Sequence, residues 1–142
     1  MTPSFTPERV VAGAAIVSNG RVLAARRSEP ASLAGRWEFP GGKAEHGETL
    51  AQACVREIRE ELGCEIRIVG ELAATVPVSQ GYVLRVAVAR LVGGEPLPLE
   101  HDAIRWLSAD ELGEVDWLPA DLPFLPEVRA LLHQPAVPGS DL

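Results

Sequence analysis

Residues 41–63 read GGKAEHGETLAQACVREIREELG, and this stretch predicts a helix that begins shortly after two adjacent glycines. Thr49 and Gln52 form a T-x-x-Q capping box at its start, and Gly63 supplies the stop at its end. Apolar residues recur along one side, as is typical of a helix face packed on a core. The predicted buried residues are Leu50, Cys54, Ile58 and Leu62.

The same helix concentrates carboxylates on a second face. Glu57, Glu60 and Glu61 occupy positions i, i+3 and i+4, so their side chains share one arc beside the buried stripe. Each close pair should cost roughly 0.2 to 0.5 kcal/mol unless a cation offsets the repulsion. A solvated helix face is the alternative explanation for the glutamates alone.

A divalent cation would neutralise this cluster. Magnesium takes hard oxygen ligands and is usually held by one or two carboxylates plus substrate phosphates. The glycine pair lets the backbone approach a ligand closely, so the Gly42 carbonyl is a further candidate ligand. Lys43 is the only lysine of the chain, and its ammonium is a candidate phosphate contact.

The rest of the sequence predicts a mixed sheet with helices on both sides. The expected strands are residues 10–17, 21–27, 65–79, 82–92 and 103–108. An Asn-Gly turn joins the first two strands, and residues 28–42 read as a turn-rich functional loop. Ser108 and Glu111 form a second capping box before a brief helix, and residues 119–133 read as a turn and a closing helix.

Length and charge restrict the class of protein. The 142 residues fit one domain, with twenty acidic and thirteen basic residues and a formal charge of −7. This charge argues against nucleic acid or an anionic membrane as the main partner. The start has no leader pattern, and no segment approaches the ~20 apolar residues of a membrane span. We expect a cytoplasmic protein with a disordered tail at residues 135–142.

The two cysteines do not indicate a disulfide framework. Cys54 falls inside the helical pattern, and Cys64 lies just past its end. No C-x-x-C pair supports a zinc site. Cys54 is expected to be a small buried apolar residue.

The spacing of the charged residues carries a family resemblance. Gly42 is followed after five residues by Glu48, and after seven more by the run REIREELGC at 56–64. This resembles the Nudix box, G-x5-E-x7-R-E-U-x-E-E-x-G-U, in which U is aliphatic. Only the last position departs, where Cys64 replaces an aliphatic residue of similar volume and polarity. The resemblance implies an α+β chain with a Nudix-like α/β/α sandwich over residues 1–134.

Nudix hydrolases cleave a nucleoside diphosphate linked to a further group, usually with Mg²⁺, for which Mn²⁺ can substitute. The resemblance implies that Arg56 and Glu48 form an ion pair that orients the helix. It assigns metal binding to Gly42, Glu57, Glu60 and Glu61. A metal-activated water would attack phosphorus in line, and its proton would pass to a box glutamate or to Glu100.

The resemblance extends beyond the box. Residues 33–49 are similar to the sequence that precedes the box in MutT-type enzymes, which act on nucleoside triphosphates. Residues 100–111 and 118–132 are similar to closing regions of the CTP pyrophosphohydrolase branch. This similarity implies that Arg27 and Lys43 face phosphates, that Phe39 lines the base pocket, and that Asp121 reads the base edge. The alternatives are surface charges, a core aromatic residue and a helix N-cap.

The leading hypothesis is a Mg²⁺-dependent pyrophosphohydrolase that converts a nucleoside triphosphate to monophosphate and pyrophosphate. Its substrate would be CTP, dCTP, 5-methyl-dCTP or 8-oxo-dGTP, and it would act as a monomer or homodimer. Tyr82, eighteen residues beyond the box, is a weaker indication of diadenosine polyphosphates. Pro77 is too near the box for the usual ADP-ribose pattern. A non-catalytic nucleotide sensor is disfavoured because the box is intact.

Overall fold

The computed structural model describes residues 8–133, so the tail predicted at 135–142 lies outside the described residues. Four strands precede the first α-helix, three follow it, and the second α-helix comes last among the described elements. The strands are β1 (Arg9–Ser18), β2 (Arg21–Arg26), β3 (Trp37–Glu38), β4 (Gly41–Lys43), β5 (Glu65–Pro77), β6 (Tyr82–Gly93) and β7 (Ala103–Leu107). The α-helices are α1 (Leu50–Leu62) and α2 (Leu125–Leu132), and the 3₁₀ turns are η1 (Ser79–Gly81), η2 (Ala109–Glu114) and η3 (Pro119–Phe124).

The sheet is mixed, as the sequence predicted. β1 lies at its centre, where it pairs parallel with β6 and antiparallel with β2 and β4. β5 pairs antiparallel with β6, and β3 and β7 both pair with β2. Asn19 and Gly20 have positive φ angles of 52° and 74°, the conformation that a tight hairpin turn needs. The Asn-Gly hairpin is therefore confirmed.

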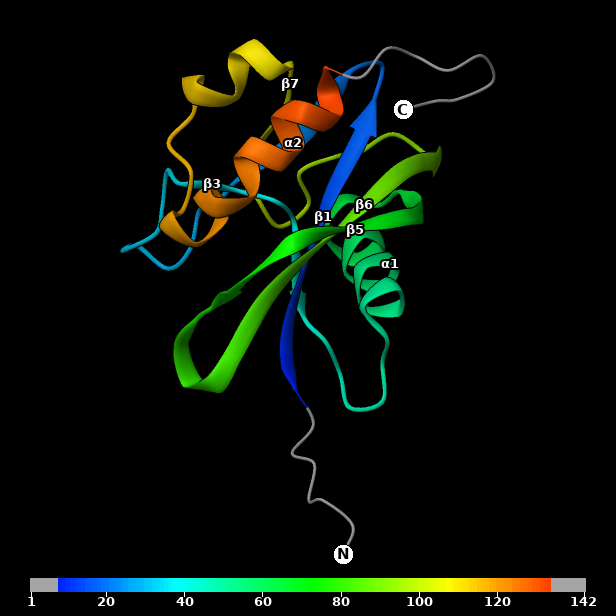
Figure 1. Ribbon diagram of the computed structural model, residues 1–142, viewed down its shortest axis with the longest axis vertical. Helices are drawn as coiled ribbons and strands as arrows, with labels where there is room; N and C mark the ends of the chain where they lie inside the picture. The colour runs from blue at the N-terminus through cyan, green and yellow to red at the C-terminus, as the bar shows by residue number, and fades with distance from the viewer. Residues whose placement is uncertain (1–7, 134–142) are drawn as a thin grey trace, which may run out of the picture.

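Helices cover both faces of the sheet (Figure 1). On one face, α1 packs Ile58 and Leu62 against Ile16 and Leu23 of the first hairpin. On the other face, Phe124 and the α2 helix pack against the alternate residues of the same strands. The α/β/α sandwich predicted from the family resemblance is confirmed.

The caps of α1 follow the sequence pattern. The Thr49 hydroxyl accepts from the Gln52 N–H at 3.1 Å, and the Gln52 side chain accepts from the Thr49 N–H at 2.9 Å. Gly63 ends the helix in the left-handed conformation, with φ of 66°. Of the predicted buried stripe, only Leu50 is half-buried rather than buried, because it is the first helical residue.

The short β4 strand positions the glycine pair under α1. Gly41 and Gly42 lie opposite Gly13 and Ala12 of β1. Gly41 has φ of +154°, and a Cβ atom there would lie 1.8 Å from the Ala12 carbonyl oxygen. The first glycine is thus required by the sheet. Within residues 8–133, no helix is long and apolar enough to cross a membrane.

Candidate active site

Arg56 organises the start of the charged face of α1. Its Nε and Nη2 donate to the two carboxylate oxygens of Glu48 at 2.7 and 2.8 Å, and its Nη1 donates to Glu57 at 2.8 Å. Nη2 also donates to the Lys43 carbonyl at 3.2 Å. The hydrogen bonds from Arg56 lower the pKa of Glu48 to about 2. The ion pair expected from the motif is present, and it ties α1 to β4 and to the loop before the helix.

The three predicted metal carboxylates differ in their surroundings. Glu60 is on the outer side of the helix, with 57% of its side chain exposed and Arg56 Nη1 at 3.8 Å. Glu57 is only 18% exposed. Its carboxylate lies against the backbone of Gly42, where a Cβ atom would come within 2.7 Å of Glu57 Cδ. The second glycine is therefore required by this carboxylate rather than by the sheet.

Glu61 is buried at the end of α1. Burial, together with the charges of Glu57, Glu38 and Glu100, raises the pKa of Glu61 to about 9. Glu57 precedes it by one helical turn, so the two carboxyl groups lie on the same side of α1. Glu61 Oε2 has no hydrogen-bond partner among the described residues. A buried carboxyl group with an unpartnered oxygen, one turn from a second carboxylate, fits a divalent cation, which would replace the proton.

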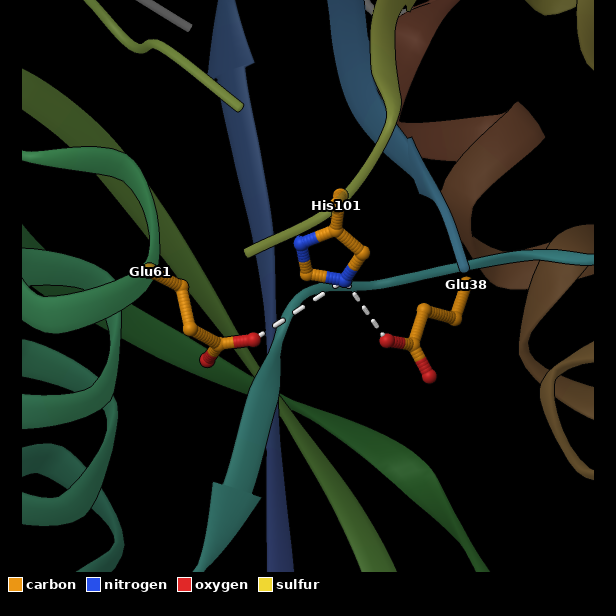
Figure 2. Close-up of side chains that lie close together, drawn as sticks. All are labelled: Glu38, Glu61 and His101. Atoms are coloured by element: carbon orange, nitrogen blue, oxygen red, sulfur yellow. Dashed lines mark hydrogen bonds and ion pairs between the residues drawn. The ribbon is translucent and has the colours of Figure 1, made fainter. Parts of the chain in front are cut away.

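Two residues that the sequence reasoning missed lie next to Glu61. His101 Nε2 is 2.8 Å from Glu38 Oε2 and 3.8 Å from Glu61 Oε1. Figure 2 shows the ring between the two carboxylates, with one edge facing both. One ligand atom from each of the three residues lies within 4.8 Å of the others, close enough to contact one ion. The sequence offers only a weak signal for them: a histidine directly after Glu100, and a glutamate before the Phe-Pro-Gly-Gly segment.

A small cavity joins several of the predicted site residues. It has a volume of about 170 Å³ and is lined by Arg27, Ser28, Glu29, Glu38, Glu61, Glu100 and His101. Arg27 Nη1 donates to Glu38 Oε1 at 3.1 Å. The structure thus brings a predicted phosphate contact, a predicted metal ligand and the candidate general base, Glu100, to one place.

The residues predicted to read the base lie on the α2 side of the sheet. The Phe39 ring packs against Trp117 with centroids 4.8 Å apart, and both are buried. Asp121 is 3% exposed. Burial, together with the Glu38 charge, raises the pKa of Asp121 to about 8 against the opposing effects of the Phe39 N–H and of Arg27. This direction favours the protonated carboxyl group, which donates as well as accepts a hydrogen bond.

Lys43 is not brought to the cavity. Its ammonium lies 4.8 Å from the centroid of the Tyr82 ring, a cation–π contact between β4 and β6. Asp121 also does not cap α2, which begins after Phe124.

Comparison with known protein families agrees with this site. The model for the NUDIX domain matches residues 7–128. The chain belongs to the Nudix family. A Mycobacterium tuberculosis protein provisionally named 8-oxo-dGTP diphosphatase 2 is 41% identical over 128 residues, which cover 88% of this chain and 91% of that protein. The CTP pyrophosphohydrolase of Escherichia coli is 36% identical over 123 residues, covering 85% and 91%.

Solved structures agree with this assignment. The Escherichia coli ORF135 protein is 36% identical and superposes with a TM-score of 0.75 over 92% of this chain and 95% of that one. A MutT Nudix hydrolase from Burkholderia pseudomallei is 32% identical, with a TM-score of 0.69 over 87% and 99%. The resemblance to MutT-type Nudix hydrolases is confirmed.

Proposed function

We propose that this Nudix hydrolase is a Mg²⁺-dependent pyrophosphohydrolase that converts a nucleoside triphosphate to the monophosphate and pyrophosphate. The observation that carries the proposal is the buried Glu61, which lines one cavity together with Arg27 and Glu100. The names of the two relatives support the substrate class, since one is a CTP pyrophosphohydrolase and the other is named for 8-oxo-dGTP. Such an activity would clean or balance the nucleotide pool of the cytoplasm.

The chemistry assigns a role to each side chain. Glu57, Glu60 and Glu61, with the Gly42 carbonyl, would hold the cation, for which Mn²⁺ can substitute. The bound cation would neutralise phosphate oxygens and lower the pKa of the attacking water. Arg27 would bind a phosphate oxygen. Glu100 would accept the proton of the water, because it lines the same cavity from a separate loop.

Orientation of the metal ligands falls to Arg56. It holds Glu57 by one hydrogen bond and Glu48 by two, so the guanidinium fixes the carboxylate that faces Gly42. Fixed ligands need no reorganisation when the metal and the phosphates bind. Lys43 stays a proposed phosphate contact that would have to leave the Tyr82 ring to reach the cavity.

Base choice would rest on Asp121 and Phe39. A protonated carboxyl group both donates and accepts, so a neutral Asp121 can pair with either kind of base edge. The closing-region similarity favours cytosine, and CTP, dCTP, 5-methyl-dCTP and 8-oxo-dGTP are the substrates to compare by kcat/KM. We expect Asp121→Ala to raise KM for CTP or dCTP and to flatten this panel while metal-dependent turnover persists. An unchanged panel in a folded Asp121→Ala protein would remove Asp121 from base recognition.

The test of the reaction is product analysis with and without a divalent cation. We expect monophosphate plus pyrophosphate, only with Mg²⁺ or Mn²⁺, and a loss of kcat by orders of magnitude in Glu61→Gln or Glu57→Gln. Glu114→Gln, which removes a half-exposed carboxylate on η2, is the matched control. Nucleoside diphosphate plus orthophosphate as the main products would refute the proposal, and so would near-full activity of Glu61→Gln at saturating Mg²⁺. A diadenosine polyphosphate in the same panel tests the weaker indication from Tyr82.

A further inference from the structure

The loop that carries Glu100 and His101 is attached to the end of α1. The Leu97 N–H donates to the Leu62 carbonyl at 2.9 Å, and the Leu99 N–H donates to the Glu61 carbonyl at 3.1 Å. These carbonyls belong to the last turn of the helix, where no further helical N–H is available. The loop therefore completes the hydrogen bonding of the helix end at Glu61 and Leu62.

The same loop is attached to β2 at its other end. The Asp102 N–H donates to the Arg26 carbonyl at 3.1 Å, and the Asp102 carboxylate accepts from Arg26 Nε at 2.6 Å. Glu100 and His101 thus lie on a short span held on both sides. Such a span directs the His101 ring into the interior, where only 5% of its side chain is exposed.

Inside, His101 faces two carboxylates with one nitrogen. Nε2 lies 2.8 Å from Glu38 Oε2 and 3.8 Å from Glu61 Oε1, whereas Nδ1 has no partner among the described residues. Nε2 must carry the hydrogen, because a carboxylate oxygen can only accept from it. The other oxygen of Glu38 accepts from Arg27 Nη1 at 3.1 Å. A continuous polar chain therefore runs from Arg27 through Glu38 and His101 to the face of Glu61.

We propose that His101 is a positioning residue of this enzyme, which holds Glu38, and through it Arg27, at a fixed place beside the metal-binding Glu61. The inference rests on the proposed function, since Arg27 and Glu61 gain their roles from it. The ring does what an apolar side chain of equal size cannot do. It donates a hydrogen bond to the half-buried Glu38 carboxylate, whose other oxygen accepts from Arg27.

Nε2 is the ring nitrogen of His101 that contacts Glu38, so a variant can keep or remove this donor alone. In His101→Gln the amide nitrogen takes the place of Nε2, so the donor to Glu38 is kept. In His101→Leu the packing volume is largely kept and the donor is lost. His133→Gln is the matched control, because His133 is exposed at the end of α2. The readouts are kcat and KM for the best nucleotide, and Mg²⁺ affinity by calorimetry without nucleotide.

We expect His101→Leu to lose roughly 10- to 100-fold in Mg²⁺ affinity or in kcat/KM, the usual effect of removing a residue that orients metal ligands. His101→Gln should recover to within about threefold of the parent, since the donor and not the ring is what acts. His133→Gln should match the parent. Equal losses in His101→Leu and His101→Gln, or no loss in His101→Leu, would overturn the proposal. If His101→Leu does not fold, His101→Asn, which draws the donor away from Glu38, replaces it under the same criteria.

A double-mutant cycle tests whether His101 acts through Glu38. Glu38→Gln removes the carboxylate charge that accepts the hydrogen bond from the His101 ring. The double variant with His101→Leu should therefore lose no more Mg²⁺ affinity or kcat/KM than the more affected single variant. Independent effects, in which the two losses multiply, would overturn the proposal. Calorimetry separates this inference from the function itself. A parent protein that hydrolyses no nucleotide refutes the proposed function, whereas Mg²⁺ affinity in the variants still decides the role of His101.

Discussion

Asp121→Asn tests the charge state of the predicted base-reading residue. Asp121 is 3% exposed, and its pKa is raised from 3.8 to about 8, first by burial and then by the Glu38 charge. A raised carboxyl pKa means that the folded protein binds this proton more tightly than the unfolded chain does. Stability is then lost as pH rises from about 4 to about 8. The loss reaches about 4 kcal/mol at pH 7, at 1.36 kcal/mol per pH unit.

Asparagine keeps the shape of the side chain and cannot ionise. We expect Asp121→Asn to gain stability relative to the parent as pH rises, by about 1.5 kcal/mol at pH 5 and up to about 4 kcal/mol at pH 7. The pH slope contributed by Glu61 is common to both proteins and cancels in the difference. Urea unfolding at pH 5, 6, 7 and 8, with chelator present, measures this difference directly.

The control is Asp116→Asn, because the Asp116 side chain is 73% exposed and pairs with Arg36 at the surface. Its difference from the parent should be nearly independent of pH over this range. A constant difference for Asp121→Asn would show that Asp121 is ionised in the folded protein.

Three further predictions follow from the site and the helix. Gly42→Ala should fold but lose about tenfold or more in Mg²⁺ affinity by calorimetry, because the new Cβ would meet the Glu57 carboxylate at 2.7 Å. Thr49→Ala should lower the free energy of unfolding by about 0.5 to 2 kcal/mol in urea, since it removes the side-chain acceptor for the Gln52 N–H. Cys54 should resist a disulfide reagent at pH 8 until urea is added, because burial raises its thiol pKa to about 12.

Features of α1 could be predicted because their causes are local in sequence. The capping box needs only Thr49 and Gln52, three residues apart, and the left-handed stop needs only Gly63. The ion pair between Glu48 and Arg56 spans eight residues and is part of the motif. Spacing along one helix and its entry loop is enough to place such groups together.

The cavity side of the site could not be predicted in the same way. Glu38 and His101 are 63 residues apart, and they meet only because β3 pairs with β2 while the loop before β7 returns to the same strand. No periodicity within either segment carries that information. The family motif covers the helix and its preceding loop, so it also gave no reason to single out Glu38 or His101.

The charge states depend on this long-range arrangement. The Glu38 charge raises the pKa of Asp121 on the α2 side and of Glu61 at the end of α1, so one carboxylate acts on both sides of the sheet. Residue type alone assigns all three side chains a negative charge near pH 7. Burial and mutual repulsion instead raise the pKa of Asp121 and of Glu61, while Arg27 and His101 donate hydrogen bonds directly to Glu38. The carboxylates that look alike in the sequence thus differ in the folded protein, because Glu60 is exposed to solvent while Glu61 and Asp121 are buried.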